Sequence, residues 1–284
     1  MGPPVGPYVT AYFVREGQIA VNPSSRVLVT GGSSGLGLAT CVELARRGHQ
    51  VVASMRDPSR AGHLLDAAAA ARGAQQIDVA VLDVAAPAAE VETTVQRIAA
   101  ASGGLDVLVN NAGTAAVAPA ERLTDAESRR TFDTNLFGAM ACIRAVLPRM
   151  RQRGAGAIIN ISSIDGRVPV AGAAAYVASK FALEGLPETL HLELRSFGIR
   201  VIIVQPGQFA TGMWTHTPAL GEQDDEPWYE AIFDDWRSLG GEPPPGAADP
   251  AGVAAPDPAL RYPIGPVGDM TAAEWISRHL ARWG

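Results

Sequence analysis

Short apolar runs alternate with longer amphipathic stretches between residues 26 and 204. The runs are rich in β-branched residues and predict strands at 26–30, 50–54, 77–82, 105–110, 156–161 and 199–204. The stretches between them predict helices at 36–47, 60–71, 87–101, 124–151 and 174–197. This alternation is typical of an α/β fold of the Rossmann type, a doubly wound parallel sheet with helices on both faces. Such sheets bind their ligands at the carboxyl ends of the strands.

At 284 residues the chain has a length that α/β folds often reach as one domain. We therefore expect a single catalytic domain over 26–284. Residues 1–25 precede the first strand and are expected to form an N-terminal extension, either a loose arm or an extra strand. Pro187 falls inside the helix predicted at 174–197, where it removes a hydrogen bond and costs about 3 kcal/mol unless a kink absorbs it.

The first strand ends in a glycine-rich turn, from Gly31 to Gly37, that leads into a helix. Glycines let the backbone approach a ligand closely, and the free N–H groups and the dipole of a helix N-terminus attract an anion. The turn therefore predicts a phosphate site. Its Gly-x-x-x-Gly-x-Gly spacing differs from the Gly-x-Gly-x-x-Gly of many dinucleotide sites.

Lys180 is the only lysine in the chain and follows Tyr176 by four residues. This spacing puts the phenol and the ammonium on one face of a helix, about 5 to 6 Å apart at Cβ. A cation there favours phenolate, so we expect the pKa of Tyr176 to be lowered toward a range useful for acid–base chemistry. The spacing alone is equally compatible with an exposed lysine beside a packed tyrosine.

Three motifs occur in order: the turn from Thr30 to Gly37, the run Asn110 to Gly113 after the fourth strand, and Tyr176-x-x-x-Lys180. Together they resemble the short-chain dehydrogenase/reductase family, and the resemblance runs from about Arg26 to Trp214. It implies a catalytic tetrad of Asn135, Ser163, Tyr176 and Lys180. It also implies a nicotinamide cofactor held by Thr30, Gly31, Ser33, Ser34, Gly35, Leu36, Gly37, Asp83, Val84, Asn111, Ala112, Gly113, Tyr176, Lys180, Pro206, Gly207 and Thr211.

Two of these assignments leave alternatives open. Ser162 stands beside Ser163 and could be the hydroxyl that meets the substrate. Asp83 could stabilise the turn after the third strand instead of contacting adenine. Within the family, the sequence is most similar to the hydroxysteroid and retinol dehydrogenase branch and its bacterial relatives, as in the run from Arg261 to Gly265.

The end of the second strand bears on the choice of cofactor. NAD enzymes usually place an acid there for the ribose 2′-hydroxyl, whereas an arginine suits the 2′-phosphate of NADP. Here Met55 stands at the position of the acid and Arg56 follows it, while Ser33 or Ser34 could add hydroxyl donors. The pattern favours NADP(H), and the alternative is a solvated arginine ahead of Asp57.

The last third of the chain carries the expectations about substrate. All five tryptophans come after position 213, and eight acids with one arginine lie between Glu222 and Glu242. The resemblance implies that residues 212–262 form a substrate lid, and an aromatic lid suits an apolar or ring-bearing small molecule. The acids disfavour anionic substrates and nucleic acid, although such a run can also be only a solvated helix face.

Composition adds several expected absences. Cys41 and Cys142 lie far apart and predict free buried thiols in a reducing compartment. The five histidines form no zinc pattern, so no metal is expected. No run of about 18 apolar residues occurs, so we expect no membrane partner and a cytoplasmic location. The resemblance implies a homodimer or homotetramer.

The sequence thus predicts an NADPH-dependent oxidoreductase that reduces a ketone or aldehyde to an alcohol, or catalyses the reverse oxidation. In the reducing direction Tyr176 would donate the proton and Ser163 would hydrogen-bond the carbonyl oxygen. Lys180 would hold the nicotinamide ribose, and Asn135 would position a water. Two alternatives stay open: a non-redox lyase or epimerase that retains the cofactor, and a catalytically silent cofactor-binding scaffold.

Overall fold

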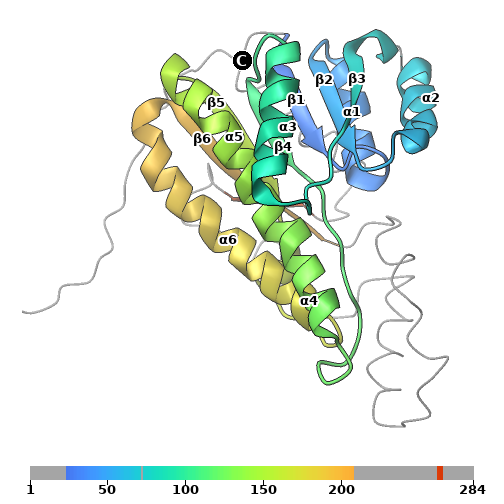
Figure 1. Cartoon of the computed structure of the whole chain (residues 1–284), viewed down its shortest axis with the longest axis vertical. Helices are drawn as coiled ribbons and strands as arrows, with labels where there is room; N and C mark the ends of the chain where they lie inside the picture. Colours follow the sequence, from blue (N-terminus) through green and yellow to red (C-terminus); the bar gives the residue numbers. More distant parts are fainter. Residues whose placement is uncertain (1–23, 72, 208–260, 265–284) are drawn as a thin grey trace, which may run out of the picture.

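A computed structural model describes residues 24–71, 73–207 and 261–264 of the chain. Within them lies one parallel sheet flanked by helices (Figure 1). The expected N-terminal extension up to Pro23, the cofactor residue Thr211 and the lid as far as residue 260 lie outside the described residues.

The sheet has seven strands in the order β3-β2-β1-β4-β5-β6-β7. They are β1 Arg26–Thr30, β2 Gln50–Met55, β3 Ile77–Val81, β4 Val107–Asn110, β5 Gly156–Ile161, β6 Ile199–Pro206 and β7 Arg261–Ile264. All six predicted strands are confirmed, with small differences at their ends. The seventh was not predicted, because β7 has only four residues and one of them is Pro263. Its place at the edge of the described sheet is where a strand tolerates proline.

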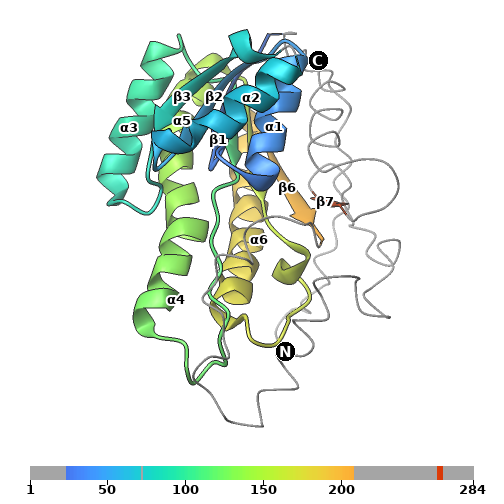
Figure 2. The ribbon, with the colours of Figure 1, turned by 90° about the vertical axis from the view of Figure 1, so that its right-hand side faces the viewer.

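Helices cover both faces of the sheet. Figure 2 shows α1 and α2 on one side, and α3 and α5 on the other with α6. Their bounds are α1 Gly35–Arg46, α2 Gly62–Ala70, α3 Ala88–Ala101, α4 Asp125–Phe132, α5 Gly138–Arg153 and α6 Ala174–Leu194. This arrangement confirms the predicted doubly wound α/β fold.

Two buried apolar clusters join these layers. The first packs β-strand residues such as Val29 and Ile159 against α1 and α2. The second packs Leu28, Leu108 and their neighbours against α3, α5 and α6. Strands β1 and β4 are therefore buried on both faces, as their continuous apolar sequences require. The two cysteines are free and buried, as predicted.

The helix predicted over 124–151 was wrong as a single element. It is divided into α4 and α5 by a π-helical turn, η3, at Asp133–Phe137. Thr124 and Glu127 form a capping box at the start of α4, as the sequence pattern of an N-terminus requires. A π-turn inserts one extra residue without breaking the helix, so the apolar periodicity on either side does not reveal it.

Pro187 does not end α6. The helix runs without interruption from Ala174 to Leu194, and the proline is buried inside it. Pro148 occupies a similar position in α5. Burial of these helices against the sheet offsets the hydrogen bond that each proline removes.

Candidate functional site

The turn between β1 and α1 can only be built from glycine at several positions. Gly31 and Gly35 have φ angles of 69° and 54°, in the left-handed region that favours glycine. A Cβ on Gly37 would overlap the carbonyl oxygen of Gly31 and the side-chain amide of Asn111. The backbone at the start of α1 is therefore uncovered by side chains at these glycines, and its segments pack closely against one another.

This turn fits a phosphate group. Ser34 is the N-cap residue of α1, and its side chain makes no capping hydrogen bond. The first turn of the helix also contains no acidic side chain. Within the described part of the chain, neither the N-cap side chain nor an acid of the first turn accepts from the leading N–H groups of α1, and these groups and the helix dipole suit an anion. Ser33 is half-buried while Ser34 is exposed, so both are available at the mouth of the turn.

Thr30 and Asn111 hold this cradle together. The Thr30 hydroxyl accepts hydrogen bonds from the backbone N–H groups of Asn111 and Ala112, each at 3.0 Å. In return Asn111 Nδ2 donates to the carbonyl oxygen of Thr30 at 2.8 Å. Thr30 is only 2% exposed. Two of the predicted cofactor residues therefore join the ends of β1 and β4, which fixes the backbone around them.

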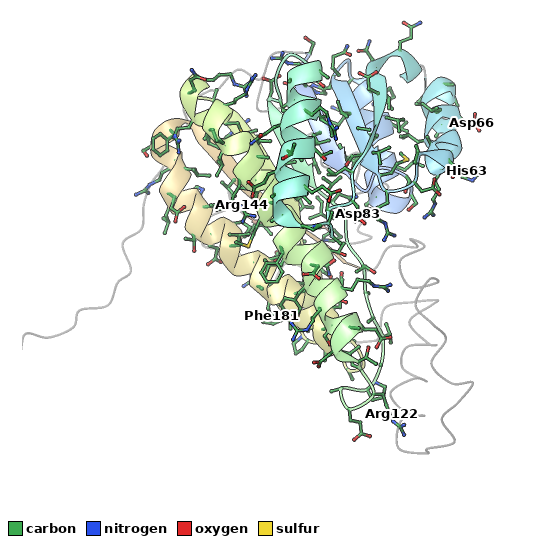
Figure 3. The ribbon with its side chains drawn as sticks, in the orientation of Figure 1. His63, Asp66, Asp83, Arg122, Arg144 and Phe181 are labelled. Atoms are coloured by element: carbon green, nitrogen blue, oxygen red, sulfur yellow. The ribbon has the colours of Figure 1, made fainter. Side chains whose placement is uncertain are left out.

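The carboxyl ends of β2 and β3 carry the other predicted adenosine contacts. Met55 is buried in the first apolar cluster, whereas Arg56 is exposed immediately beyond the strand. Asp83 lies where the chain leaves β3 on its way to α3 (Figure 3) and accepts a hydrogen bond from the N–H of Ala85 at 3.0 Å. That bond is the turn-stabilising role considered above, and Val84 beside it is buried.

Residues at the ends of β4 and β6 complete the rim. Gly113 is half-buried just beyond β4, and Leu36 is half-buried in the first turn of α1. Pro206 is the last residue of β6, and the half-buried Gly207 follows it. All four therefore lie at the carboxyl edge of the sheet, where the fold binds ligands.

Ser163, Tyr176 and Lys180 come together beyond β5. Their exposed fractions are 6%, 4% and 3%. A side-chain hydrogen bond joins Tyr176 and Ser163, and Lys180 Nζ lies 5.6 Å from the centre of the Tyr176 ring. Ser162 instead has its hydroxyl beneath Gly166, in the 3₁₀ turn η4, Ile164–Gly166. The geometry therefore favours Ser163 over Ser162 as the hydroxyl that acts with Tyr176.

The expected lowering of the Tyr176 pKa was wrong for this structure. Burial raises the pKa of Tyr176 above its ordinary value, and it outweighs the opposing effect of the hydrogen bond with Ser163. The nearby carboxyl of Asp165 raises it further. The helix spacing put Lys180 on the correct face, but it could not show how completely the phenol is desolvated. Tyr176 is thus a neutral phenol throughout the physiological range.

Lys180 is buried with a titratable ammonium group. Its Nζ donates a 2.9 Å hydrogen bond to the carbonyl oxygen of Ile161, at the end of β5. Burial lowers the pKa of Lys180 to about 8, and the carboxyl groups of Glu184 and Asp165 partly oppose this change. Phe181, the next residue, lies on the outside of the helix layer and is 46% exposed (Figure 3). Lys180 therefore points inward, and the alternative interpretation of Lys180 as an exposed helix residue is wrong.

Asn135 lies in the π-helical turn, and its side-chain amide makes hydrogen bonds within the protein. Its Oδ1 accepts from the N–H of Thr114 at 2.8 Å, and its Nδ2 donates to the Thr114 carbonyl and to Ser179 Oγ, each at 2.9 Å. Ser179 in turn donates to the carbonyl oxygen of Tyr176 at 2.7 Å. Asn135 thus ties the loop after β4 to α6, the helix that carries Tyr176 and Lys180.

Several residues of the site were not predicted. Asp165 follows Ser163 by two residues and lies among the tetrad, and this proximity in sequence was the available signal. Ser179 links Asn135 to the tyrosine helix. Glu184 is buried one turn beyond Lys180 and accepts a 2.8 Å hydrogen bond from Gln205 of β6. The partner of Glu184 comes from a distant strand, so no local pattern could reveal the pair.

Neither a metal centre nor a membrane span is found in the described part of the chain. In it, no three His, Cys, Asp or Glu side chains gather in a way that could hold a metal ion. Of the helices that the structure describes, none combines the length and apolar character needed to cross a bilayer.

Relatives of known sequence match about two thirds of this chain. A sequence model of the short chain dehydrogenase family matches residues 25–219. Retinol dehydrogenase 8 of Bos taurus is 44% identical over 189 residues, which cover 65% of this chain and 59% of the bovine protein. The 3-alpha-(or 20-beta)-hydroxysteroid dehydrogenase of Mycobacterium tuberculosis is 39% identical over 197 residues, covering 67% and 71% of the two chains. The chain thus matches less than two thirds of the length of the bovine relative.

Solved structures agree with the sequence matches. A short-chain dehydrogenase from Streptomyces avermitilis superposes with a TM-score of 0.71 at 34% identity, covering 91% of this chain and 93% of the other. A metagenomic short-chain oxidoreductase in complex with NADP gives a TM-score of 0.61 at 34% identity, covering 66% and 85%. A match over this much of the chain, on this fold, shows that the protein belongs to the short chain dehydrogenase family of oxidoreductases.

Proposed function

We propose that the protein reduces a ketone or aldehyde on an apolar or ring-bearing small molecule to the alcohol, or catalyses the reverse oxidation, with NADP(H). The observation that carries this proposal is the buried group of Ser163, Tyr176 and Lys180 at the same edge of the sheet as the glycine turn. A neutral phenol next to a serine hydroxyl is suited to giving a proton to a carbonyl oxygen.

The cofactor, when bound, supplies or accepts the hydride. In the reducing direction Tyr176 donates its proton to the substrate oxygen. Ser163 hydrogen-bonds the same oxygen as negative charge develops on it. Lys180, whose ammonium is held at the end of β5, would hold the ribose next to the nicotinamide and provide positive charge for the resulting phenolate. The side-chain amide of Asn135 is engaged in hydrogen bonds to the loop after β4 and to α6. The backbone of Asn135, rather than this amide, would therefore hold a water.

The substrate class is inferred from relatives and from the sequence. The bovine and mycobacterial relatives are named for retinol and hydroxysteroids, which are apolar, ring-bearing alcohols. The tryptophans after position 213 are compatible with such a substrate. A screen of ketones and alcohols that follows the absorbance of NADPH tests this step. Binding of NADPH without net turnover on any of them would contradict a redox function.

The cofactor preference is inferred from the end of β2. Met55 is only 3% exposed and offers no acceptor to a ribose 2′-hydroxyl, whereas Arg56 is exposed and can reach a 2′-phosphate. A similar structure, the metagenomic oxidoreductase, contains NADP. Both observations support NADPH over NADH.

Replacing Arg56 tests this preference. A hydrogen bond to a charged group is worth about 1.5 to 3 kcal/mol, so Arg56→Ala should weaken NADPH binding by roughly 10- to 150-fold. Binding of NADH should hardly change, because NADH has no phosphate at that position. Arg60→Ala, which removes an exposed arginine four residues later, is the matched control. Dissociation constants of both cofactors from fluorescence titration measure the effect, and a parent protein that prefers NADH would refute the assignment.

A further inference from the structure

Asp165 is a carboxyl group inside the site that the proposed reaction does not use. It lies in η4, two residues after Ser163, and is half-buried. The Ser163 hydroxyl donates to Asp165 Oδ2 at 3.3 Å and accepts from the N–H of Asp165 at 3.1 Å. Asp165 is thus hydrogen-bonded to the hydroxyl group that, in the proposed reaction, donates to the substrate oxygen.

The hydrogen-bonding capacity of Ser163 is limited. A serine hydroxyl has one proton to donate and two lone pairs that accept. When Asp165 is ionised, the Ser163 hydroxyl donates a hydrogen bond to its carboxylate, and one lone pair of the hydroxyl oxygen accepts a hydrogen bond from the Asp165 N–H. Because the hydroxyl has only one proton, a serine that donates it to Asp165 has none left to donate to a carbonyl oxygen.

We propose that Asp165 is a positioning residue that controls the direction of the Ser163 proton and thereby the pH range of carbonyl reduction. When Asp165 is ionised, its carboxylate accepts the hydrogen bond of the Ser163 hydroxyl, which then cannot donate to the substrate oxygen. When Asp165 is protonated, its O–H donates to Ser163 Oγ, and the serine proton turns to the reacting oxygen. The inference rests on the proposed function, because it concerns the hydroxyl that the reduction uses.

The surroundings of Asp165 place this switch above the ordinary range of an aspartate. Burial raises the pKa of Asp165, whereas the Ser163 hydrogen bond and the charge of Lys180 lower it by less. Among the residues that the structure describes, the titratable groups that face this turn are Tyr176, Lys180 and Glu184, all from α6. The uncharged Gln205 of β6 donates a hydrogen bond to Glu184. A raised pKa keeps the acid protonated to higher pH, so the Ser163 proton is available on the acid side and is withdrawn as pH rises.

The test compares pH profiles of kcat and KM for ketone reduction in the parent and in Asp165→Asn. The kcat of the parent should fall at least about tenfold as pH rises through the pKa of the carboxyl group. This factor is smaller than the ~10² to 10³ that complete loss of an oxyanion donor costs in kcat. Asparagine cannot ionise and its amide can donate to Ser163 at every pH, so the variant should lack this fall. Asp165→Glu, which keeps a carboxyl, should restore it. An Asp165→Asn enzyme with the pH profile of the parent would overturn the proposal.

A second measurement does not need turnover. The ¹³C signal of the Asp165 carboxyl, titrated by NMR in the parent and in Ser163→Ala, reports the bond directly. Loss of the serine donor should raise the pKa of Asp165, because the hydroxyl stabilises the carboxylate. An unchanged pKa would show that the two groups are not coupled and would refute the switch even if Asp165→Asn does not fold. If the pKa responds but the parent reduces no ketone, the proposed function fails and the Ser163–Asp165 coupling stands.

Discussion

Tyr176 is defined by its surroundings more than by its neighbours in sequence. Its ring packs with Ala115 and Ala173 in a small apolar cluster, and burial keeps its proton in place. Phenylalanine fills the same space without the hydroxyl, so Tyr176→Phe should fold normally. It should lose about 10² to 10⁴ in turnover, the range for general acid catalysis, while cofactor affinity changes little. Steady-state kinetics with a parallel cofactor titration measure both, and near-parental turnover would exclude Tyr176 as the proton donor.

Lys180 gives a prediction about protonation. It is the only lysine in the sequence, so protein labelled with ¹³C-lysine has a single set of lysine side-chain signals. The pKa of that group should lie near 8, well below the 10.5 of a free lysine, because burial disfavours the ammonium. A titration by NMR reads it directly, and a pKa close to that of a free lysine would show that the group is solvated.

The same shift predicts a dependence of stability on pH. Lys180 binds its proton more weakly in the folded protein, whose pKa is about 8, than in the unfolded chain at 10.5. Between these values only the unfolded chain stays protonated at this site, so the free energy of unfolding rises with pH. Relative to Lys180→Met, it should rise by about 3 kcal/mol over that window. Denaturant unfolding of both proteins measures the difference, and a difference independent of pH would contradict the assignment.

Between elements, Thr30 makes the connection that shapes the phosphate turn. Its hydroxyl accepts from two backbone N–H groups after β4, and valine has the same shape but no acceptor. Thr30→Val should therefore destabilise the protein by about 1 to 3 kcal/mol, since it leaves two partly buried backbone donors without their acceptor. It should also weaken cofactor binding, because the cradle is no longer fixed. Thr30→Ser keeps the oxygen and is the control; equal stability of the two variants would show that the hydroxyl is not needed.

The elements also show what could be predicted from the sequence. The alternation of short apolar runs with amphipathic stretches identified six strands and most helices, because strands buried on both faces are continuously apolar and each helix buries one face. It could not identify η3 or β7, since a π-turn adds one residue and a four-residue edge strand has too short a pattern. Motif spacing found the tyrosine and the lysine of the site. Their pKa shifts depend on burial and on packing between distant segments. The hydrogen bond between Ser163 and Asp165 is local, and their separation of two residues was the available signal.

At the scale of the whole molecule, the first strand lies inside the sheet and not at its edge. β1 is the third strand in the sheet order, between β2, which follows it closely in sequence, and β4, which does not. Leu28 of β1 pairs with Val52 on one side and Leu108 on the other. The two apolar clusters meet across this strand, so neither is complete until β4 has joined.

This strand order has a consequence for synthesis on the ribosome. Contacts between β1 and the chain next to β4 span 80 residues, as the bond from Arg26 to Asp106 does. At about 5 to 20 residues per second, β4 emerges roughly 4 to 16 s after β1. During that interval β1 and β2 can pair, but the far edge of β1 remains an open row of backbone donors and acceptors flanked by valine and leucine. The nascent chain therefore carries this open edge, a possible site of aggregation, until its fourth strand has been made.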